Sequence, residues 1–194
     1  WFHNPGPGDV DLTVSLLLRD QANLSPDLQL IRIPEGSTLM FRDALAELFG
    51  IDSAAGALRV QATGPVVAGA RVFNQTGASV RESQGQLMPG IPAGSAIGPG
   101  ESTDVPGVLQ PQTGDFRSNF GLVETSGEGA RVEVTLLAGE GTTLESQHIT
   151  LAPREVVQRS IAGLVPEGGL EVGRLHVAVV SEAGSVLVYG SAVA

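Results

Sequence analysis

The sequence predicts an all-β fold of two tandem antiparallel β-sandwich modules, each with one short helix, that arose by internal duplication. Three observations carry this prediction. Apolar and polar residues alternate over short segments, similar segments recur about 120 residues apart, and the 194 residues include 26 glycines and 12 prolines. Such a high content of turn-forming residues suits short strands joined by many turns.

The alternation has a period of two residues, which is typical of half-buried antiparallel strands. One face of each segment is apolar: Leu12, Val14, Leu16 and Leu18; Val132, Val134 and Leu136; Leu175, Val177 and Val179. The residues between them, such as Thr13, Ser15 and Leu17, are expected to point to the opposite face.

The internal repeat rests on four pairs of similar segments. Residues 12–17 match 132–137, 31–34 match 149–152, 56–60 match 173–177, and 67–70 match 188–191. The shift between partners changes by a few residues, and only between segments, as insertions confined to loops would produce.

Each module is expected to carry one short helix that caps the sheets or crosses between them. Asp43 is the expected N-cap of a helix over 44–49, which Gly50 ends. Ser160 is the expected N-cap of a helix over 161–165, just before Pro166.

The predicted boundaries are 1–76 for the first module, 77–114 for a Gly/Pro-rich connector and 115–194 for the second module. A flexible linker is one interpretation of the connector. Its recurring apolar residues favour an ordered, extended segment instead: Leu87, Met88, Ile91, Ile97, Val105, Val108 and Leu109.

The first module is predicted to lack its N-terminal strand. The second module has a strand's length of sequence, 115–120, ahead of the position that corresponds to Trp1, with Phe116 and Phe120 expected to face a core. Upstream residues of a longer protein could fill the gap, or the connector could fold back into it. A strand donated by a neighbouring subunit is the third alternative, and its repetition would build a filament.

Composition limits the partners. The net charge of −10 opposes binding to nucleic acid and to anionic membranes, and no apolar run is long enough for membrane insertion. The absence of cysteine excludes disulfides and thiolate metal sites. The chain starts at Trp1 without methionine, which predicts a removed signal peptide or upstream region, or a fragment.

One stretch carries a resemblance to a known kind of repeat. Residues 116–126, with the sequence Phe-Arg-Ser-Asn-Phe-Gly-Leu-Val-Glu-Thr-Ser, resemble the opening of tandem Ig-like repeats in secreted and surface proteins of soil and thermophilic bacteria. Residues 3–6 look like the matching turn of the first module, and residues 96–101 and 105–108 look like that family's inter-repeat segment. The resemblance implies a secreted Ig-like sandwich and supplies no catalytic residues.

No motif in the sequence indicates catalysis, a cofactor or a metal. His3, His148 and His176 lack the spacing of metal ligands, and we interpret them as ordinary strand or surface histidines. The acid pairs Asp9/Asp11 and Glu101/Asp104 are too sparse for a calcium loop and are interpreted as solvated turn residues. The sequons that begin at Asn23 and Asn74 are interpreted as chance matches.

These observations favour a non-enzymatic, extracellular or cell-surface structural protein whose partners are other copies of itself or surface proteins. In this hypothesis it is a subunit of a fibre or filament assembled by strand addition. The alternative is an adhesion module that binds a polysaccharide or a protein within a larger secreted protein. The low content of aromatic residues, 4%, opposes a sugar-stacking cleft, and Trp1 is expected to serve as a hydrophobic anchor.

Overall fold

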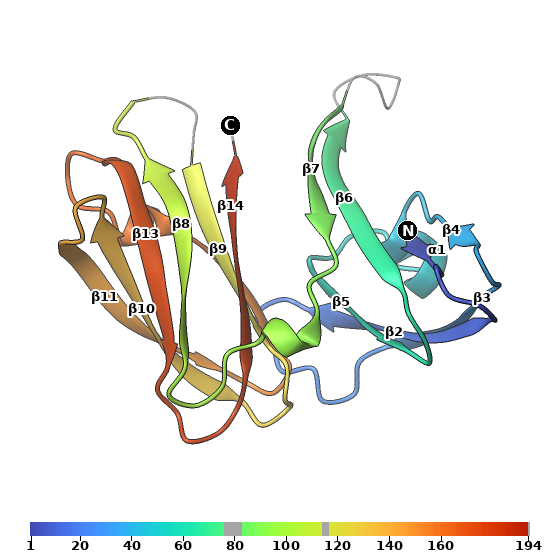
Figure 1. Cartoon of the computed structure of the whole chain (residues 1–194). Coiled ribbons are helices and arrows are strands. Elements are labelled where there is room, and N and C mark those ends of the chain that lie inside the picture. The colour runs from blue at the N-terminus through green and yellow to red at the C-terminus, as the bar shows by residue number, and fades with distance from the viewer. Residues whose placement is uncertain (76–82, 114–116, 194) are drawn as a thin grey trace. The chain divides into compact units, whose positions relative to one another are not determined.

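The computed structural model describes residues 1–75, 83–113 and 117–193 (Figure 1). Strands make up 54% of the structure and helices 7%, in several antiparallel sheets, which confirms the predicted all-β class. The chain divides into two compact units, described separately below. The first unit contains residues 1–16, 27–54 and 58–92, and the second contains 17–26, 55–57 and 93–194.

The first unit contains two sheets, with strand orders β4-β1-β6-β7 and β3-β2-β5 (Figure 1). Its elements are β1 (Phe2–His3), β2 (Val10–Leu18), β3 (Leu28–Ile33), β4 (Thr38–Leu39), α1 (Ala44–Phe49), β5 (Gly56–Ala62), β6 (Val67–Gln75) and β7 (Ser83–Pro89). The last two residues of β2 and the first two of β5 belong to the second unit.

The second unit also has two sheets, with strand orders β12-β9-β14 and β11-β10-β13-β8. Its elements are η2 (Ala93–Ser95), β8 (Ser102–Gln110), β9 (Arg117–Glu124), β10 (Ala130–Ala138), β11 (Thr143–Leu151), β12 (Val156–Ser160), η3 (Ile161–Gly163), β13 (Leu170–Val179) and β14 (Val186–Val193).

The two units share the order of six strands: β4-β1-β6 corresponds to β12-β9-β14, and β3-β2-β5 corresponds to β11-β10-β13. The pairing registers agree as well. Phe2 pairs with Leu39 and Ala68, and Leu122 pairs with Val157 and Val188. In the other sheet Val10 pairs with Ile33, as Ala130 pairs with Leu151.

This register corrects the predicted match of residues 67–70 with 188–191 by one position. Ala68, not Val67, occupies the place of Val188. Ala68 and Val188 both pack against a core, whereas Val67 is exposed. A shift of one residue reverses the face of a strand, so the register distinguishes matches that the sequence alone leaves ambiguous.

The cores of the two units differ in size. Sixteen buried apolar residues, drawn from both sheets, form the core of the second unit, and five form that of the first: Phe2, Val10, Leu12, Val14 and Ile33. The predicted alternation holds along β10, where Val132, Val134 and Leu136 are buried. In β2 it fails near the end, because Leu16 and Leu17 are both buried.

The predicted helices are present at the expected sites, but one is shorter than predicted. α1 has Asp43 as its N-cap, and Gly50 ends it in the left-handed conformation at a φ of 65°. The second helix is a single 3₁₀ turn, Ile161–Gly163, with Ser160 as its N-cap. Glycine at 163 and proline at 166 leave too little good helix-forming sequence for a full turn of α-helix.

The residues predicted to form a connector contribute strands to both units. β7 pairs with β6 in the first unit, and β8 pairs with β13 in the second. Of the apolar residues that favoured an ordered connector, Val108 belongs to the core of the second unit and Val105 packs against it, whereas Leu87 and Ile91 are exposed.

A two-residue strand, β1, lies where the first module was predicted to lack its N-terminal strand. β1 pairs with β4 on one side and with β6 on the other, and Phe2 fills the core between the sheets. It has two residues, whereas the corresponding β9 has eight. Phe120 is buried as predicted, and Phe116 lies outside the described residues.

Candidate functional site

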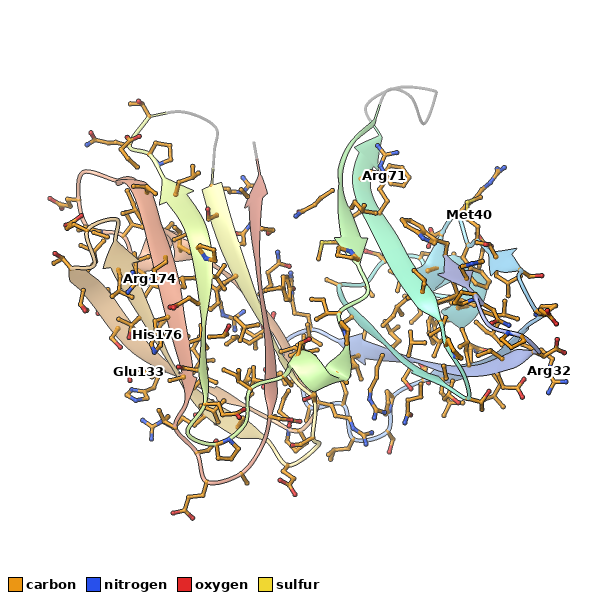
Figure 2. All side chains as sticks on the ribbon, viewed as in Figure 1. Arg32, Met40, Arg71, Glu133, Arg174 and His176 are labelled. Atoms are coloured by element: carbon orange, nitrogen blue, oxygen red, sulfur yellow. The ribbon has the colours of Figure 1, made fainter. Side chains whose placement is uncertain are left out.

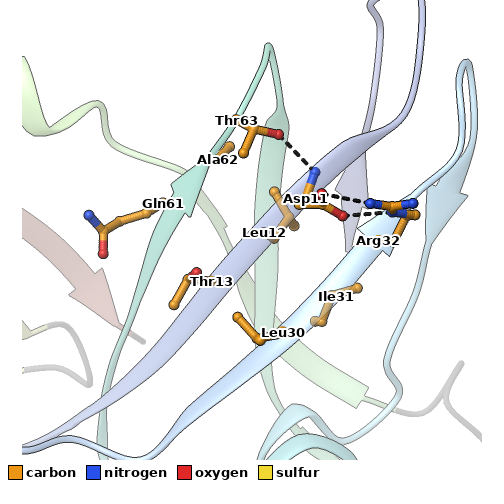
Figure 3. A pocket seen from close by; sticks show the side chains of 9 residues that line it. All are labelled: Asp11, Leu12, Thr13, Leu30, Ile31, Arg32, Gln61, Ala62 and Thr63. Carbon is orange, nitrogen blue, oxygen red and sulfur yellow. Dashed lines mark hydrogen bonds and ion pairs between the residues drawn. The ribbon is translucent and has the colours of Figure 1, made fainter.

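A hollow of about 520 Å³ lies on the first unit, over the face of the β3-β2-β5 sheet opposite to the core (Figure 3). Asp11 and Arg32 form its polar end, where Nε and Nη2 of Arg32 donate to the two carboxylate oxygens of Asp11 at 2.7 and 2.9 Å. The hydrogen bond from Arg32 lowers the pKa of Asp11. Leu30 and Ala62 form apolar parts of the lining.

The chemistry available in this hollow is limited. The hydroxyl of Thr63 accepts a hydrogen bond from the backbone N–H of Asp11 at 3.0 Å. Asp11, which was interpreted from sequence as a solvated turn residue, instead lies on a strand and is paired with Arg32. The lining contains no histidine and no aromatic residue, so it lacks the stacking surface that a sugar site normally uses.

The three histidines lie on strands or strand ends, in separate places. Nδ1 of His3 is 3.0 Å from Oγ1 of Thr38, and His148 lies opposite Glu133 in the β10–β11 ladder. His176 lies on β13 (Figure 2). Its Nδ1 is 3.0 Å from Oδ1 of Asp104. Within the described ranges no three His, Cys, Asp or Glu residues come together as metal ligands.

The other acids singled out from the sequence have local roles. Glu101 accepts a hydrogen bond from the backbone N–H of Gly98 at 2.7 Å, and Asp104 contacts His176 and Arg174. Asn23, the first sequon position, is 5% exposed, and its Nδ2 donates to three backbone carbonyls. A glycan on Asn23 would have to break this packing. The side chain of Asn74 lies outside the described part of the chain.

Sequence reasoning missed a pair of buried polar residues at corresponding places in the two units. Asn4 follows β1, and its Nδ2 donates to the carbonyls of Gly8, Ile33 and Pro34 while Oδ1 accepts from the N–H of Gly6. Glu124 ends β9, and its carboxylate accepts from backbone N–H groups of Ser126, Gly127 and Arg154 and from the Ser126 hydroxyl. Each side chain forms hydrogen bonds with two turns: Asn4 with residues 6–8 and 33–34, and Glu124 with residues 126–127 and Arg154. Their role is therefore structural.

A further apolar feature of the first unit is the face of the β4-β1-β6-β7 sheet that points away from the core, which we call the outer face. Phe2, Leu39 and Ala68 pack on the core side, so their neighbours along the strands point outward. The outer face carries Trp1, Val67, Phe73 and Leu87, all exposed in the described structure. Its basic residue Arg71 holds its guanidinium carbon 5.3 Å from the centroid of the Phe73 ring.

Exposed apolar side chains concentrate on the first unit as a whole. Of twelve large hydrophobic residues exposed in the described ranges, nine belong to it: Trp1, Leu28, Leu30, Met40, Val67, Val72, Phe73, Leu87 and Ile91. The unit with the smaller core therefore leaves more apolar surface in water, a pattern that favours an interaction surface.

Comparison with known proteins supplies no relative. No family model, curated protein or solved structure matches the chain. Within the described residues, no helix has the length and apolar character needed to cross a membrane.

Proposed function

We propose that the chain is a non-enzymatic structural protein of the cell surface or extracellular space that assembles with other copies of itself by strand addition. The observation that carries the proposal is the concentration of exposed apolar side chains on the first unit, over a core of only five buried residues. Burying such surface against a partner would add the hydrophobic stabilisation that this small core does not provide.

The proposal includes an origin by duplication of one Ig-like β-sandwich module. The shared order of six strands and the shared pairing registers support this origin. Gly36 and Arg154 add a local correspondence, because both have a positive φ and both follow the β3 or β11 strand at the same distance. An ordinary side chain rarely adopts this conformation, so its recurrence marks the same turn in both units.

A polysaccharide or protein adhesion module is the second candidate. The hollow beside Asp11 and Arg32 is the place where such a ligand would bind, but it lacks aromatic residues. The exposed apolar face therefore favours assembly over sugar binding.

Sedimentation velocity from micromolar to near-millimolar concentration tests the assembly proposal. We expect species heavier than one chain to increase with concentration, and negative-stain microscopy then separates closed oligomers from fibres. A chain that sediments as a monomer throughout this range would overturn the proposal.

A further inference from the structure

Strand β7 is an edge strand whose sequence lacks the usual protection against pairing with another chain. It pairs with β6 on one side and ends its sheet. Its residues, Ser-Gln-Gly-Gln-Leu-Met-Pro, include no charge. Natural edge strands are commonly protected by charged side chains, by proline, by bulges or by being very short, and of these β7 has only a proline, Pro89, as its last residue.

Most other edge strands of the described structure have such protection. β3 carries Arg32, β5 carries Arg59, β11 carries Glu145 and β12 carries Arg159. β4 has only two residues, and β8 has a register shift and Asp104. β14 is also uncharged, but Ile97 exchanges two hydrogen bonds with Val186 near its start.

The register shows which backbone groups of β7 point away from β6. Gly69 exchanges hydrogen bonds with Trp1, the residue before β1, and the carbonyl of Ala68 accepts from the N–H of Gly90. Alternation along both strands then directs the backbone groups of Gln84, Gln86 and Met88 toward β6. The N–H and C=O groups of Ser83, Gly85 and Leu87, and the C=O of Pro89, point outward.

Two apolar side chains, Phe73 and Leu87, lie beside this edge on the outer face. Gly85 lies opposite Phe73, and a Cβ atom on Gly85 would come 2.5 Å from the Cβ of Phe73. Phe73 and the backbone of Val72 therefore occupy the space beside Gly85, and only a glycine fits at this position of the strand. Leu87, two residues along the strand, is 61% exposed on the same face.

We propose that β7 pairs antiparallel with β7 of a second copy of this chain, about a two-fold axis at Gln86. In this register the outward groups of Gly85 in one copy exchange two hydrogen bonds with those of Leu87 in the other, and the symmetric exchange adds two more. The N–H of each Ser83 meets the carbonyl of Pro89, whose missing N–H costs nothing at the strand end. Leu87 of each copy lies over Gly85 of the other, against Phe73.

Two features of this edge support a second copy as its partner. When two copies of β7 run antiparallel about Gln86, Ser83 lies opposite Pro89 and Gly85 lies opposite Leu87 of the other copy. Every outward N–H of the seven residues then faces a carbonyl acceptor. The chain has a net charge of −10, so two copies repel over most of their surfaces. The uncharged edge and the outer face with Arg71 carry no acidic residue among the described side chains.

This inference rests on the proposed assembly function and specifies its contact. The two four-stranded sheets would become one continuous sheet of eight strands across the axis. Because the contact is isologous, it closes on itself and forms a dimer, so a filament would need a second, different contact.

Cysteine cross-linking tests the register directly, because the chain has no cysteine of its own. In the proposed pairing, residue 86 faces its own counterpart in a non-hydrogen-bonded pair, with Cα atoms about 4.5 Å apart, which suits a disulfide. We expect Gln86→Cys to form a covalent dimer under mild oxidation. Leu87→Cys should cross-link far more slowly, because its counterpart lies diagonally, about 7–8 Å away. Gln29→Cys, exposed on edge strand β3, is the control.

Sedimentation of edge variants gives a second, independent test. Leu87→Pro removes an N–H that points outward and leaves the bonds to β6 in place, and Leu87→Lys places a charge on the edge. We expect either change to weaken dimerisation at least tenfold, with an unchanged circular dichroism spectrum. The matched control is Gln29→Lys, which places the same charge on an exposed position of edge strand β3 in the same unit and should leave dimerisation intact.

The outcomes separate the two proposals. If the wild type is monomeric at every concentration, the assembly function and this inference both fall. If Leu87→Lys and Leu87→Pro self-associate as strongly as the wild type, the β7 contact is wrong while assembly stands. The same conclusion follows if Gln86→Cys cross-links no faster than Gln29→Cys. A cross-link at residue 87 that exceeds the one at residue 86 would overturn the proposed register.

Discussion

At the scale of single residues, each unit connects two of its turns through one buried polar side chain, and the two side chains differ in their hydrogen-bonding chemistry. Asn4 lies just after β1, and Glu124 is the last residue of β9, the corresponding strand of the second unit. Both side chains are fully buried. Asn4 donates mainly to carbonyls, whereas Glu124 accepts from N–H groups. The surrounding turns therefore determine which residue type fits, because a buried polar group is stable only when its own hydrogen-bonding capacity is matched.

The carboxylate of Glu124 links stability to pH. Burial raises its pKa, but hydrogen bonds from Ser126, Arg154 and Gly127 outweigh that effect and hold the pKa below the ordinary value of 4.5. A carboxyl with a lowered pKa in the folded state contributes stability fully above its unfolded pKa, and that contribution disappears as the pH falls through the folded value.

We therefore expect Glu124→Gln to lower the free energy of unfolding of the second unit by about 1.5–3 kcal/mol at neutral pH, the usual contribution of hydrogen bonds to a charged group. The difference from wild type should shrink as the pH falls below 4.5. Urea unfolding across this pH range measures both effects. Glu128→Gln, exposed in the same turn, is the control, and an equal loss in both variants would contradict the role of Glu124.

Asn23 performs a similar task in the segment 17–26, which belongs to the second unit although it precedes most of the first. Its Oδ1 accepts from Leu18 N–H at 2.8 Å, and its Nδ2 donates to the carbonyl of Arg154 at 2.9 Å. The side chain thus joins this segment to the turn that follows β11.

Replacing Asn23 with alanine should free that segment. We expect Asn23→Ala to lower the free energy of local unfolding of residues 17–26 by about 1–3 kcal/mol, because the N–H of Leu18 and the carbonyl of Arg154 lose their hydrogen bonds to Asn23. Hydrogen exchange at the amide of Leu18 should then accelerate at least fivefold, whereas the exposed neighbour variant Gln21→Ala should leave it unchanged. Unaltered exchange in Asn23→Ala would show that other contacts hold the segment.

At the scale of elements, the face of each residue in β10 decides its tolerance to charge. Val134 is fully buried, and Thr135, on the opposite face, is partly exposed with its hydroxyl 3.1 Å from that of Ser146. The ladder with β11 pairs Val134 with Gln147 and Thr135 with Ser146, so the alternation is fixed along the strand.

We expect Val134→Asp to unfold the second unit, with a loss of more than about 4 kcal/mol, because an unpaired carboxylate would be buried. Thr135→Asp should stay within about 1 kcal/mol of wild type, since water reaches that face. Thermal melts followed by circular dichroism distinguish the two variants, and equal melting temperatures would contradict the register.

At the scale of the whole molecule, the two units share a strand order but differ in core size. Sixteen buried apolar residues support the second unit and five support the first. Because apolar burial is the main source of folding stability, the first unit should be the less stable of the two.

Native-state hydrogen exchange tests this order with matched positions. Leu12 and Val132, and likewise Val14 and Val134, occupy corresponding places in ladders of the same register. We expect the amides of Leu12 and Val14 to be protected at least tenfold less than those of Val132 and Val134 at low protein concentration. Equal protection would show that core size does not set the stability of these units.

The sequence by itself determined the all-β class, the alternation that buries Val132, Val134 and Leu136, and the positions of both short helices. These features depend on local chemistry: the two-residue period of a strand, a capping side chain and a helix-ending glycine or proline. The segments that sequence comparison paired lie on strands with the same order in the two units, except that residues 67–70 and 188–191 differ from the observed register by one position.

Only the tertiary structure decided which residues share a unit and which strand lies at an edge. Residues 17–26 belong to the second unit. β7 and β8, which both lie in the predicted connector, pair with strands of different units. Asn4 and Glu124 are buried because turns distant in the sequence pack around them. Each outcome depends on pairing between residues far apart in the chain. The partner of a strand edge is not encoded in the period of its own residues, because alternation specifies which face is buried and not which neighbour supplies the hydrogen bonds.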